Sequence, residues 1–305
     1  MIRVFEALTG EERQQLWMHL SSLGHEMHVD GFAEMVEKYG GEVYDYGRGH
    51  FSLWANGQVV GSLGVITREI PERGEAFITG AYIARERLED FPRLLTRALA
   101  HLLPYEVNRV SLGIPPTGEY LLPLLEEQGF CDSHMAMILC HRRDAPDRDP
   151  GVDVELVRLN PINGDEFRRI YNRTLAWVPN GGSLSEKDLG EMLNSQVTAG
   201  LCVRRGEPVG VYQLMEGTEV GWIEAIGVDP DFQGQGIGWS LLTRLTRSLY
   251  ASGSREVKLG VMSSNRGALR LYHRCRFEKD RVTGIWLVMN ADRGTLKDPA
   301  IGLRG

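Results

Sequence analysis

A glycine-rich stretch is the part of the sequence best suited to chemistry. Residues 222–245, WIEAIGVDPDFQGQGIGWSLLTRL, place an apolar strand before a glycine-rich turn and an amphipathic helix. Gly234, Gly236 and Gly238 carry no Cβ, so a ligand can approach the backbone there. The first amides of a helix have no partner within it and lie at the positive end of its dipole. The turn is therefore predicted to bind phosphate oxygens.

Two common phosphate-binding motifs do not fit this turn. A P-loop requires GxxxxGK followed by Ser or Thr, and the turn contains no Lys. A dinucleotide fingerprint requires GxGxxG, but after Gly234 and Gly236 the third glycine position is occupied by Trp239. Residues 233–238, QGQGIG, have instead the spacing QxxGxG. They follow a strand ending in VDP and precede a helix that contains Leu-Leu.

In this context, QGQGIG closely resembles the pyrophosphate-binding motif of the GNAT superfamily of acyl-CoA-dependent N-acyltransferases. A second stretch, residues 265–277 (NRGALRLYHRCRF), is similar to that family's segment with Asn, Ala, Leu-Tyr and Gly-Phe in order. Arg276 stands where the family usually has Gly before Phe, a departure that bears on the turn there. The resemblance covers about residues 153–290 and does not extend to the acceptor substrate.

The resemblance implies that acetyl-CoA or a related acyl-CoA is the acyl donor. The scattered cysteines, and two histidines without a further ligand, separately predict that the protein binds no metal. The backbone of the strand would pair with the pantetheine arm as an added strand does. A free strand amide would polarise the thioester carbonyl and stabilise the tetrahedral oxyanion. The implied cofactor-binding residues are Ile226, Gly227, Val228, Gln233, Gly234, Gln235, Gly236, Ile237, Gly238 and Asn265. Asn265 begins a predicted helix, so its role is either an N-cap or a cofactor contact.

Two side chains are candidates for proton transfer. Acyl transfer needs a neutral amine, whereas an alkyl amine with a pKa of about 10.4 arrives protonated. Glu224 lies where related enzymes often carry a base, and a period of two places it on the same face as Trp222 and Ile226. The alternatives for Glu224 are binding of the substrate ammonium and a solvated or ion-paired charge. Tyr272 matches the tyrosine that protonates the departing thiolate; the alternative is an ordinary tyrosine of an amphipathic helix.

An internal repeat predicts two domains. Three short matches recur in order at spacings of 147–149 residues: 56–61 (NGQVVG) with 205–210 (RGEPVG), 94–97 with 241–244 (both LLTR), and Phe130 with Phe277. The predicted domains are 1–143 and 153–305, joined by a charged, proline-containing linker at 144–152. We expect an α/β fold with two tandem GNAT-like domains, each a mixed, mostly antiparallel sheet flanked by helices.

The predicted elements of the second domain alternate between strands and helices. The predicted strands are 153–159, 200–205, 208–216, 220–228, 256–261 and 282–289. The predicted helices are 164–176, 185–195, 236–251 and 265–274.

The first domain is predicted to lack the chemical groups. At an offset of 147, the glycine turn falls on residues 87–91, RLEDF, which contain no glycine and two carboxylates. Like charge there repels a pyrophosphate. At the same offset Glu224 falls on Phe77 and Tyr272 on Leu125. The first domain is therefore expected to be a degenerate copy.

Composition narrows the class of protein. The 305 residues are 42% hydrophobic and carry a net charge of -7, which argues against a nucleic-acid partner. Four scattered cysteines, no transmembrane stretch and no secretory signal favour a cytoplasmic protein. His25 and His28 have helical spacing without a further ligand, and Arg204 and Arg205 are interpreted as a solvated hairpin. The oligomeric state is not predicted.

The leading prediction is an N-acetyltransferase that moves an acetyl group from acetyl-CoA to a primary amine, of a small molecule, by direct attack on the thioester. The alternatives are a protein or peptide N-acetyltransferase and a non-catalytic acyl-CoA-binding module.

Overall fold

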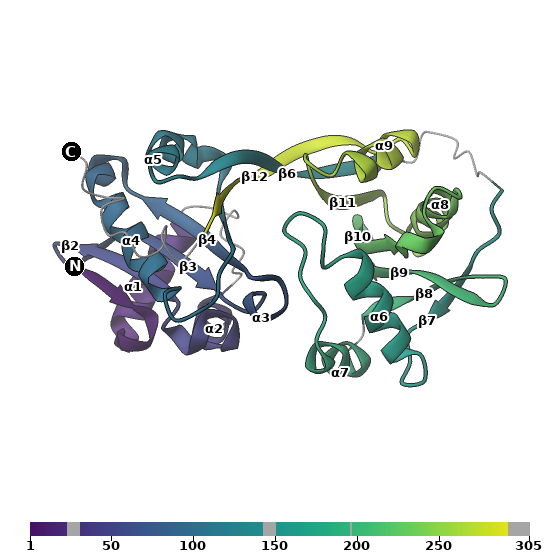
Figure 1. Ribbon diagram of the computed structural model, residues 1–305, viewed down its shortest axis with the longest axis horizontal. Helices are drawn as coiled ribbons and strands as arrows, with labels where there is room; N and C mark the ends of the chain where they lie inside the picture. Colours follow the sequence, from purple (N-terminus) through teal and green to yellow (C-terminus); the bar gives the residue numbers. More distant parts are fainter. Residues whose placement is uncertain (23–30, 143–150, 196, 292–305) are drawn as a thin grey trace. The chain divides into compact units, whose positions relative to one another are not determined.

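The computed structural model describes residues 1–22, 31–142, 151–195 and 197–291 (Figure 1). His25, His28 and most of the predicted linker lie outside these residues. The chain forms two compact units: unit 1 is Met1–Met135 with Thr283–Gly305, and unit 2 is Ala136–Val282.

Unit 2 carries the glycine-rich turn. Its strands are the part of β6 (Cys131–Arg142) from Ala136 onward, β7 (Glu155–Arg158), β8 (Thr198–Arg204), β9 (Glu207–Met215), β10 (Val220–Val228) and β11 (Glu256–Met262). Its helices are α6 (Gly164–Thr174), α7 (Glu186–Asn194), α8 (Ile237–Ala251) and α9 (Arg266–Arg274). Every predicted element of the second domain is present with its ends shifted by a few residues, but the predicted strand 282–289 falls in β12 (Glu278–Asn290), whose residues from Thr283 onward belong to unit 1.

The sheet of unit 2 has the order β6-β11-β10-β9-β8-β7. Among the described strands of this unit, β10 and β11 are the only parallel pair, and the other neighbours are antiparallel. Side chains of α8, among them Leu241 and Leu245, pack with Ile223 on one face of the sheet. On the other face, Phe167 of α6 packs with Val211 of β9. This arrangement confirms a layered α/β unit with a mixed sheet, covered by helices on both faces (Figure 1).

Unit 1 has the same plan. Its sheet order is β1-β2-β3-β4-β5-β12, where the only parallel pair among the described strands is β4 with β5. Its strands are β1 (Ile2–Val4), β2 (His50–Ala55), β3 (Gln58–Ile66), β4 (Glu75–Ile83), β5 (Arg109–Ile114) and the end of β12 (Glu278–Asn290). Its helices are α1 (Gly10–Ser22), α2 (Phe32–Gly40), α3 (Ile70–Arg73), α4 (Phe91–His101) and α5 (Leu122–Glu127).

Each sheet is completed by a strand from the other half of the sequence. Residues Ala136–Arg142 of β6 pair with β11 in unit 2. Residues Ile285–Asn290 of β12 pair with β5 in unit 1. The compact units therefore differ from the continuous domains 1–143 and 153–305. The continuous boundaries describe the repeat in the sequence and stay a prediction.

The hairpins at the first repeated motif have the same turn in both units. Asn56 and Gly57 connect β2 to β3 with φ values of 51° and 76°. Arg205 and Gly206 connect β8 to β9 with φ values of 52° and 81°. Two consecutive residues with positive φ are typical of a two-residue turn whose twist matches the strands it joins. The short sequence match thus marks a repeated structural element.

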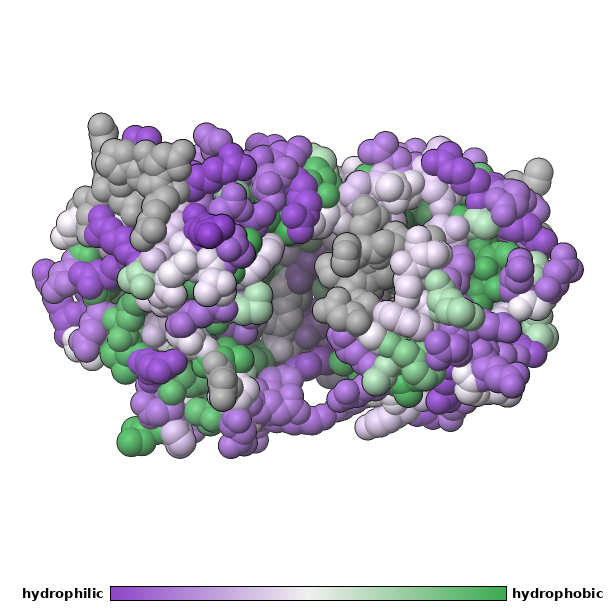
Figure 2. Space-filling view, turned by 180° about the vertical axis from the view of Figure 1, so that it is seen from behind, coloured by the Kyte–Doolittle hydropathy of each residue, from purple (hydrophilic) through white to green (hydrophobic). Residues whose placement is uncertain are grey.

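Figure 2 shows hydrophilic residues spread over the visible surface of each unit, with smaller hydrophobic patches between them. Within the described residues, no helix is both long enough and apolar enough to span a bilayer.

Candidate acyl-donor site

Strand β10 leaves its parallel neighbour halfway along its length. It pairs with β11 only from Val220 to Ile223, whereas β11 continues beside β6 as far as Met262. On its other side, β10 stays paired with β9 up to Val228. The backbone of β10 beyond Ile223 therefore faces an opening on the β11 side, as the predicted splay requires.

The open edge does not offer every backbone group that was predicted. The amide of Asp229 donates to Val209 O of β9 at 2.9 Å. Backbone groups alternate in direction along an antiparallel strand, so those of Ile226 and Val228 face the opening and those of Gly227 face β9. The carbonyl of Val228 already accepts a hydrogen bond from Gln233 Nε2 at 3.0 Å. Ile226 is thus the residue best placed to pair with a ligand backbone.

A β-bulge changes the predicted orientation of Glu224. Ile223 pairs with Leu214 but Ala225 pairs with Gln213, so Glu224 is the additional residue. The shift reverses the alternation of faces beyond the bulge. Ile226 consequently packs with the α8 side of the sheet, opposite to Glu224. The expectation that Glu224 and Ile226 share a face is wrong, because a period of two holds only for an unbulged strand.

Glu224 lies on the side of the sheet that α6 covers. Its Oε2 accepts a hydrogen bond of 2.8 Å from Gln213 Nε2. Gln213 lies two residues after Val211 on β9, so both side chains point to the same face of the sheet, and Val211 packs with α6 there. The carboxylate is exposed to solvent. An exposed carboxylate held by one amide donor is available to an incoming ammonium group.

The glycine-rich turn ends where α8 begins. Gly234 and Gly236 have φ values of 76° and 79°, a conformation that favours glycine. Gly236 is the N-cap, and the first hydrogen bond of the helix runs from Ser240 N to Gly236 O at 3.2 Å. The amides of residues 237–239 precede that bond, so they have no partner within the helix. They are positioned to donate to an anion at the helix N-terminus.

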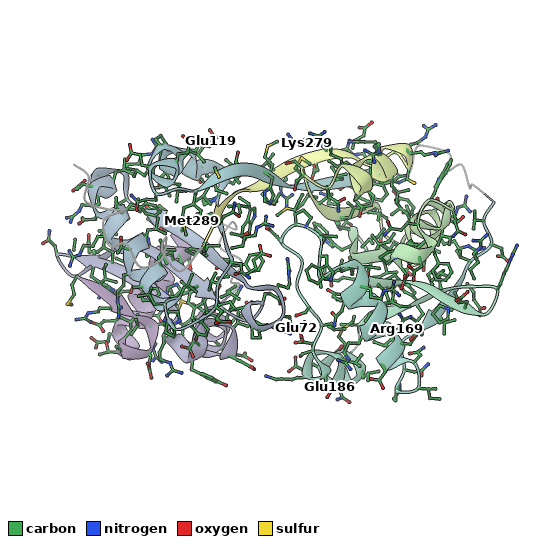
Figure 3. All side chains as sticks on the ribbon, viewed as in Figure 1. Glu72, Glu119, Arg169, Glu186, Lys279 and Met289 are labelled. Atoms are coloured by element: carbon green, nitrogen blue, oxygen red, sulfur yellow. The ribbon has the colours of Figure 1, made fainter. Side chains whose placement is uncertain are left out.

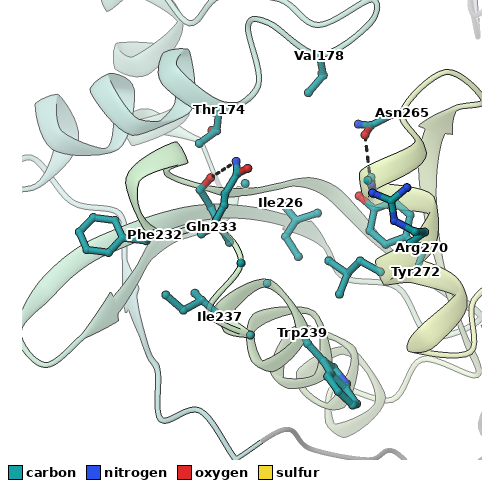
Figure 4. Close-up of a pocket in the computed structure, with 18 of the residues that line it drawn as sticks. Thr174, Val178, Ile226, Phe232, Gln233, Ile237, Trp239, Asn265, Arg270 and Tyr272 are labelled. Carbon is teal, nitrogen blue, oxygen red and sulfur yellow. Dashed lines mark hydrogen bonds between the residues drawn. The ribbon is translucent and has the colours of Figure 1, made fainter.

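A cavity of about 690 Å³ follows the open edge of β10 to this turn (Figure 4). It is lined by Thr174, Leu175, Val178, Ile226, Gly227, Val228, Phe232, Gln233, Gly234, Gly236, Ile237, Gly238, Trp239, Asn265, Gly267, Ala268, Arg270, Leu271, Tyr272 and Arg274. Of the twelve predicted site residues, ten line it. Gln235 and Glu224 do not: Gln235 Oε1 accepts a hydrogen bond of 2.7 Å from Arg204 Nη1, and Glu224 lies in the bulge.

Ion pairs hold the end of α6 beside the turn. Arg173 Nη1 lies 3.2 Å from Asp229 Oδ2, and its Nη2 lies 2.9 Å from Asp231 Oδ2. Arg169 on the same helix (Figure 3) approaches Asp229 Oδ2 to 3.9 Å. The Asp229 side chain is 2% exposed, and a buried carboxylate requires such partners. The ion pairs position Thr174 at the end of α6, close against β10. A Cβ added to Gly227 would lie only 2.5 Å from Thr174 Oγ1, so this close approach requires a glycine at position 227.

Helix α9 supplies the opposite wall. Asn265 is its N-cap, because its Oδ1 accepts from Ala268 N at 3.2 Å, and it also lines the cavity (Figure 4). The cap is therefore observed, while a cofactor contact through its Nδ2 remains a prediction. Arg276 adopts a φ of 63° just before Phe277, so the turn expected of a glycine is retained with an arginine.

Tyr272 is buried in this wall, with 7% of its surface exposed. Burial raises the pKa of its phenol to about 12. In the described part of the chain, no group hydrogen-bonds its hydroxyl. A thiol has a pKa of about 8.5, so full proton transfer from such a phenol to a thiolate is uphill. The geometry favours a hydroxyl that donates a hydrogen bond to the thiolate over one that releases its proton fully.

Sequence reasoning missed three arginines. Arg204 was interpreted as a solvated hairpin residue, but it is held against the turn through Gln235. Arg270 and Arg274 line the cavity and were not singled out. Their spacing of four residues on a predicted helix was the available signal, since it places both on one face.

The Gly236 position offers a direct test of the turn. We expect Gly236→Asp to weaken acetyl-CoA binding at least tenfold, about 1.4 kcal/mol, because the added carboxylate enters the anion site. The φ of 79° adds a strain of about 1 kcal/mol to folding. Calorimetric titration measures the affinity and thermal unfolding checks the fold. Gly236→Asn is the matched neutral control, and an unchanged affinity in folded Gly236→Asp would place the donor elsewhere.

Known proteins resemble this chain at the levels of sequence and fold. The model of the acetyltransferase (GNAT) family matches residues 163–277. A mycothiol acetyltransferase from Saccharopolyspora erythraea is 30% identical over 138 residues, which are 43% of this chain and 45% of the relative. An uncharacterized N-acetyltransferase from Methanocaldococcus jannaschii is 38% identical over 96 residues, 29% of this chain and 42% of the relative. The chain thus spans less than half the length of these curated relatives.

Two solved structures match almost the whole chain. A GCN5-related N-acetyltransferase from Sphaerobacter thermophilus has a TM-score of 0.66 at 19% identity and covers 94% of both chains. A tandem GNAT protein from the clavulanic acid biosynthesis pathway has a TM-score of 0.61 at 13% identity, covering 96% of this chain and 98% of that one. At such identities the likeness concerns the fold.

The splayed strand, the glycine turn and the family match define a GNAT-type acetyltransferase domain in the C-terminal half of the chain. Over 94% and 96% of its residues, respectively, the chain shares the fold of that GCN5-related N-acetyltransferase and of that tandem GNAT protein.

Proposed function

We propose that the protein transfers an acetyl group from acetyl-CoA to a primary amine of a small molecule, by direct attack of the amine on the thioester. The observation that carries this proposal is the cavity that joins the open edge of β10 to the N-terminus of α8. Pantetheine amides would pair with Ile226, and the turn would hold the pyrophosphate. Tyr272 would then lie beside the thioester sulfur.

In the proposed reaction two side chains have different roles. Glu224 removes a proton from the substrate ammonium, so that a neutral amine attacks the thioester carbonyl. A free amide of β10 stabilises the tetrahedral oxyanion. As the C–S bond breaks, the Tyr272 hydroxyl donates a hydrogen bond to the thiolate. The nitrogen gives its remaining extra proton to solvent water, and the released thiolate takes a proton from solvent, so that the products are the acetamide and CoA thiol.

The test is a panel of small amines assayed with acetyl-CoA by release of free CoA thiol. The panel includes the acceptor of mycothiol acetyltransferase, because the similarity to those enzymes makes it a candidate. It also includes peptides with free N-termini and lysines. Turnover of small amines above that of peptides supports the proposal; turnover of peptides alone supports the protein-acceptor alternative. Binding of acetyl-CoA without turnover of any acceptor supports a binding module.

Unit 1 retains only part of the donor-site geometry. Strand β4 leaves β5 after Ile78 as β10 leaves β11, but the carbonyl of Ile83 accepts from the Tyr120 hydroxyl at 2.7 Å. Residues Glu75–Ile78 of β4 pair with β5 as Val220–Ile223 of β10 pair with β11, so β4 and β10 align at an offset of 145 residues. The counterpart of Glu224 is therefore Thr79 instead of Phe77. Thr79 carries no carboxylate and contacts Tyr44 OH at 3.0 Å.

The counterparts of Tyr272 and of the glycine-rich turn also lack the functional groups in unit 1. Leu125 corresponds to Tyr272, since each residue's carbonyl accepts the amide of the phenylalanine five positions later. The segment before α4 is a 3-10 helix at Arg85–Asp90, in which Asp90 pairs with Arg87. Unit 1 therefore supports the proposal of a degenerate copy.

We expect one acetyl-CoA to bind per chain. The reason is that the anion site and the open strand edge occur together only in unit 2, as far as the described residues extend. Calorimetric titration should give a stoichiometry near one, and Gly236→Asp should weaken that single event. Two equivalent binding events would contradict the degeneracy of unit 1.

A further inference from the structure

Helix α9 carries a stripe of arginines beside the donor cavity. Arg266, Arg270 and Arg274 are spaced by four residues, so they lie on one face of the helix. All three are exposed, and in the described part of the chain none is paired with a carboxylate. The protein has 41 acidic and 34 basic residues, so the local charge of this stripe is opposite in sign to the net charge of -7. Such a stripe is suited to bind an anion.

Two of these arginines reach the cavity, and the third does not. Arg270 and Arg274 line it, whereas Arg266 is outside the lining. Figure 4 labels Arg270 among the residues that α9 contributes to the cavity lining, with Tyr272 of the same helix. The Arg274 guanidinium lies 3.7 Å from the ring centroid of Trp239, which belongs to the first turn of α8. Stacking on the indole holds that guanidinium next to the anion site.

A CoA thioester has one more anionic group than the turn can satisfy. If the pantetheine arm follows β10 and the pyrophosphate lies on the turn, the adenosine end continues past the first turn of α8. That end carries a 3′-phosphate, a phosphomonoester with a charge of about -1.5 to -2 at pH 7. Backbone amides suffice for a pyrophosphate at a helix N-terminus. A dianionic monoester is bound more strongly by guanidinium groups, which donate two hydrogen bonds in one plane.

We propose that Arg270 and Arg274 bind the 3′-phosphate of the acyl-CoA donor and thereby select CoA thioesters over thioesters that lack this group. The assignment rests on the proposed function, since it takes acetyl-CoA as the donor. It adds a specificity determinant to that site. Trp239 orients Arg274 through the stacked contact, and Arg270 lies one helical turn away.

The test compares acetyl-CoA with acetyl-dephospho-CoA, which differs only by the 3′-phosphate. Calorimetry gives the dissociation constant of each thioester. We expect the full-length protein to bind acetyl-CoA at least tenfold more tightly. In Arg270→Gln and Arg274→Gln this ratio should fall, and in the double variant it should approach one. The affinity for acetyl-dephospho-CoA should change less than about twofold in each variant, because the missing phosphate leaves the arginines nothing to bind.

Arg266→Gln is the matched control, since it removes the same charge from the same helix face outside the cavity. Its ratio should equal that of the unsubstituted protein. An equal loss in Arg266→Gln would reveal general electrostatic attraction and overturn the assignment. Equal affinities of the unsubstituted protein for both thioesters would also overturn it while leaving the proposed function intact. If neither thioester binds, the proposed donor fails and this assignment fails with it.

Discussion

Replacing Glu224 by glutamine is expected to lower kcat about a hundredfold to ten-thousandfold, with acetyl-CoA affinity nearly unchanged. A positioned general base contributes an effect of that size. Glu224 lies outside the donor cavity and on the α6 side of the sheet, so its loss should not disturb the donor. Steady-state kinetics with a saturating amine and calorimetry with acetyl-CoA measure the two quantities separately.

The pH profile distinguishes a base from a binding group. Without the carboxylate, more of the amine must arrive neutral from solution, so the rate of Glu224→Gln should rise toward higher pH than that of the unsubstituted protein. A raised KM for the amine with an unchanged kcat would instead assign Glu224 to ammonium binding. Glu207→Gln, an exposed glutamate at the start of β9, is the matched control and should leave both constants unchanged.

The order of elements in unit 2 could be predicted from the sequence because each element carries a local signal. Alternating strands, a two-residue turn at Arg205-Gly206 and an apolar helical stripe after Gly236 act over short distances. The glycine turn was also predictable, since its positive φ values need residues without a Cβ. Even Arg276 follows the expected turn, because a left-handed residue costs only about 1 kcal/mol.

The missed features depend on interactions distant in the sequence. The bulge at Glu224 appears only in the pairing of β10 with β9, and no residue type marks it. The exchange of β6 and β12 between the sheets likewise depends on pairing with distant strands, because β6 pairs with β11 and β12 pairs with β5. The offset of 147 holds for Tyr272 and Leu125 but is 145 for β10 and β4, because the loops between them differ in length. A single offset therefore misplaced the counterpart of Glu224.

Tyr272→Phe is expected to lower kcat by about tenfold to a hundredfold with little change in acetyl-CoA affinity. The hydroxyl is proposed to donate a hydrogen bond to the departing thiolate, and a bond to a charged group is worth about 1.5–3 kcal/mol. Phenylalanine retains the ring, so the packing of α9 against Phe277 should persist. Tyr105→Phe in unit 1, at a partly exposed tyrosine, is the control for the loss of a hydroxyl.

The raised pKa of Tyr272 sets the sign of the pH dependence. Burial favours the neutral phenol, so the pKa lies at about 12, above the ordinary value. The hydroxyl keeps its proton at every pH below that value, and the hydrogen bond to the thiolate remains available throughout the assay range. The kcat of the unsubstituted protein should therefore show no decline near pH 10 from this group. A decline with a midpoint near pH 10 that disappears in Tyr272→Phe would contradict both the buried phenol and its proposed role.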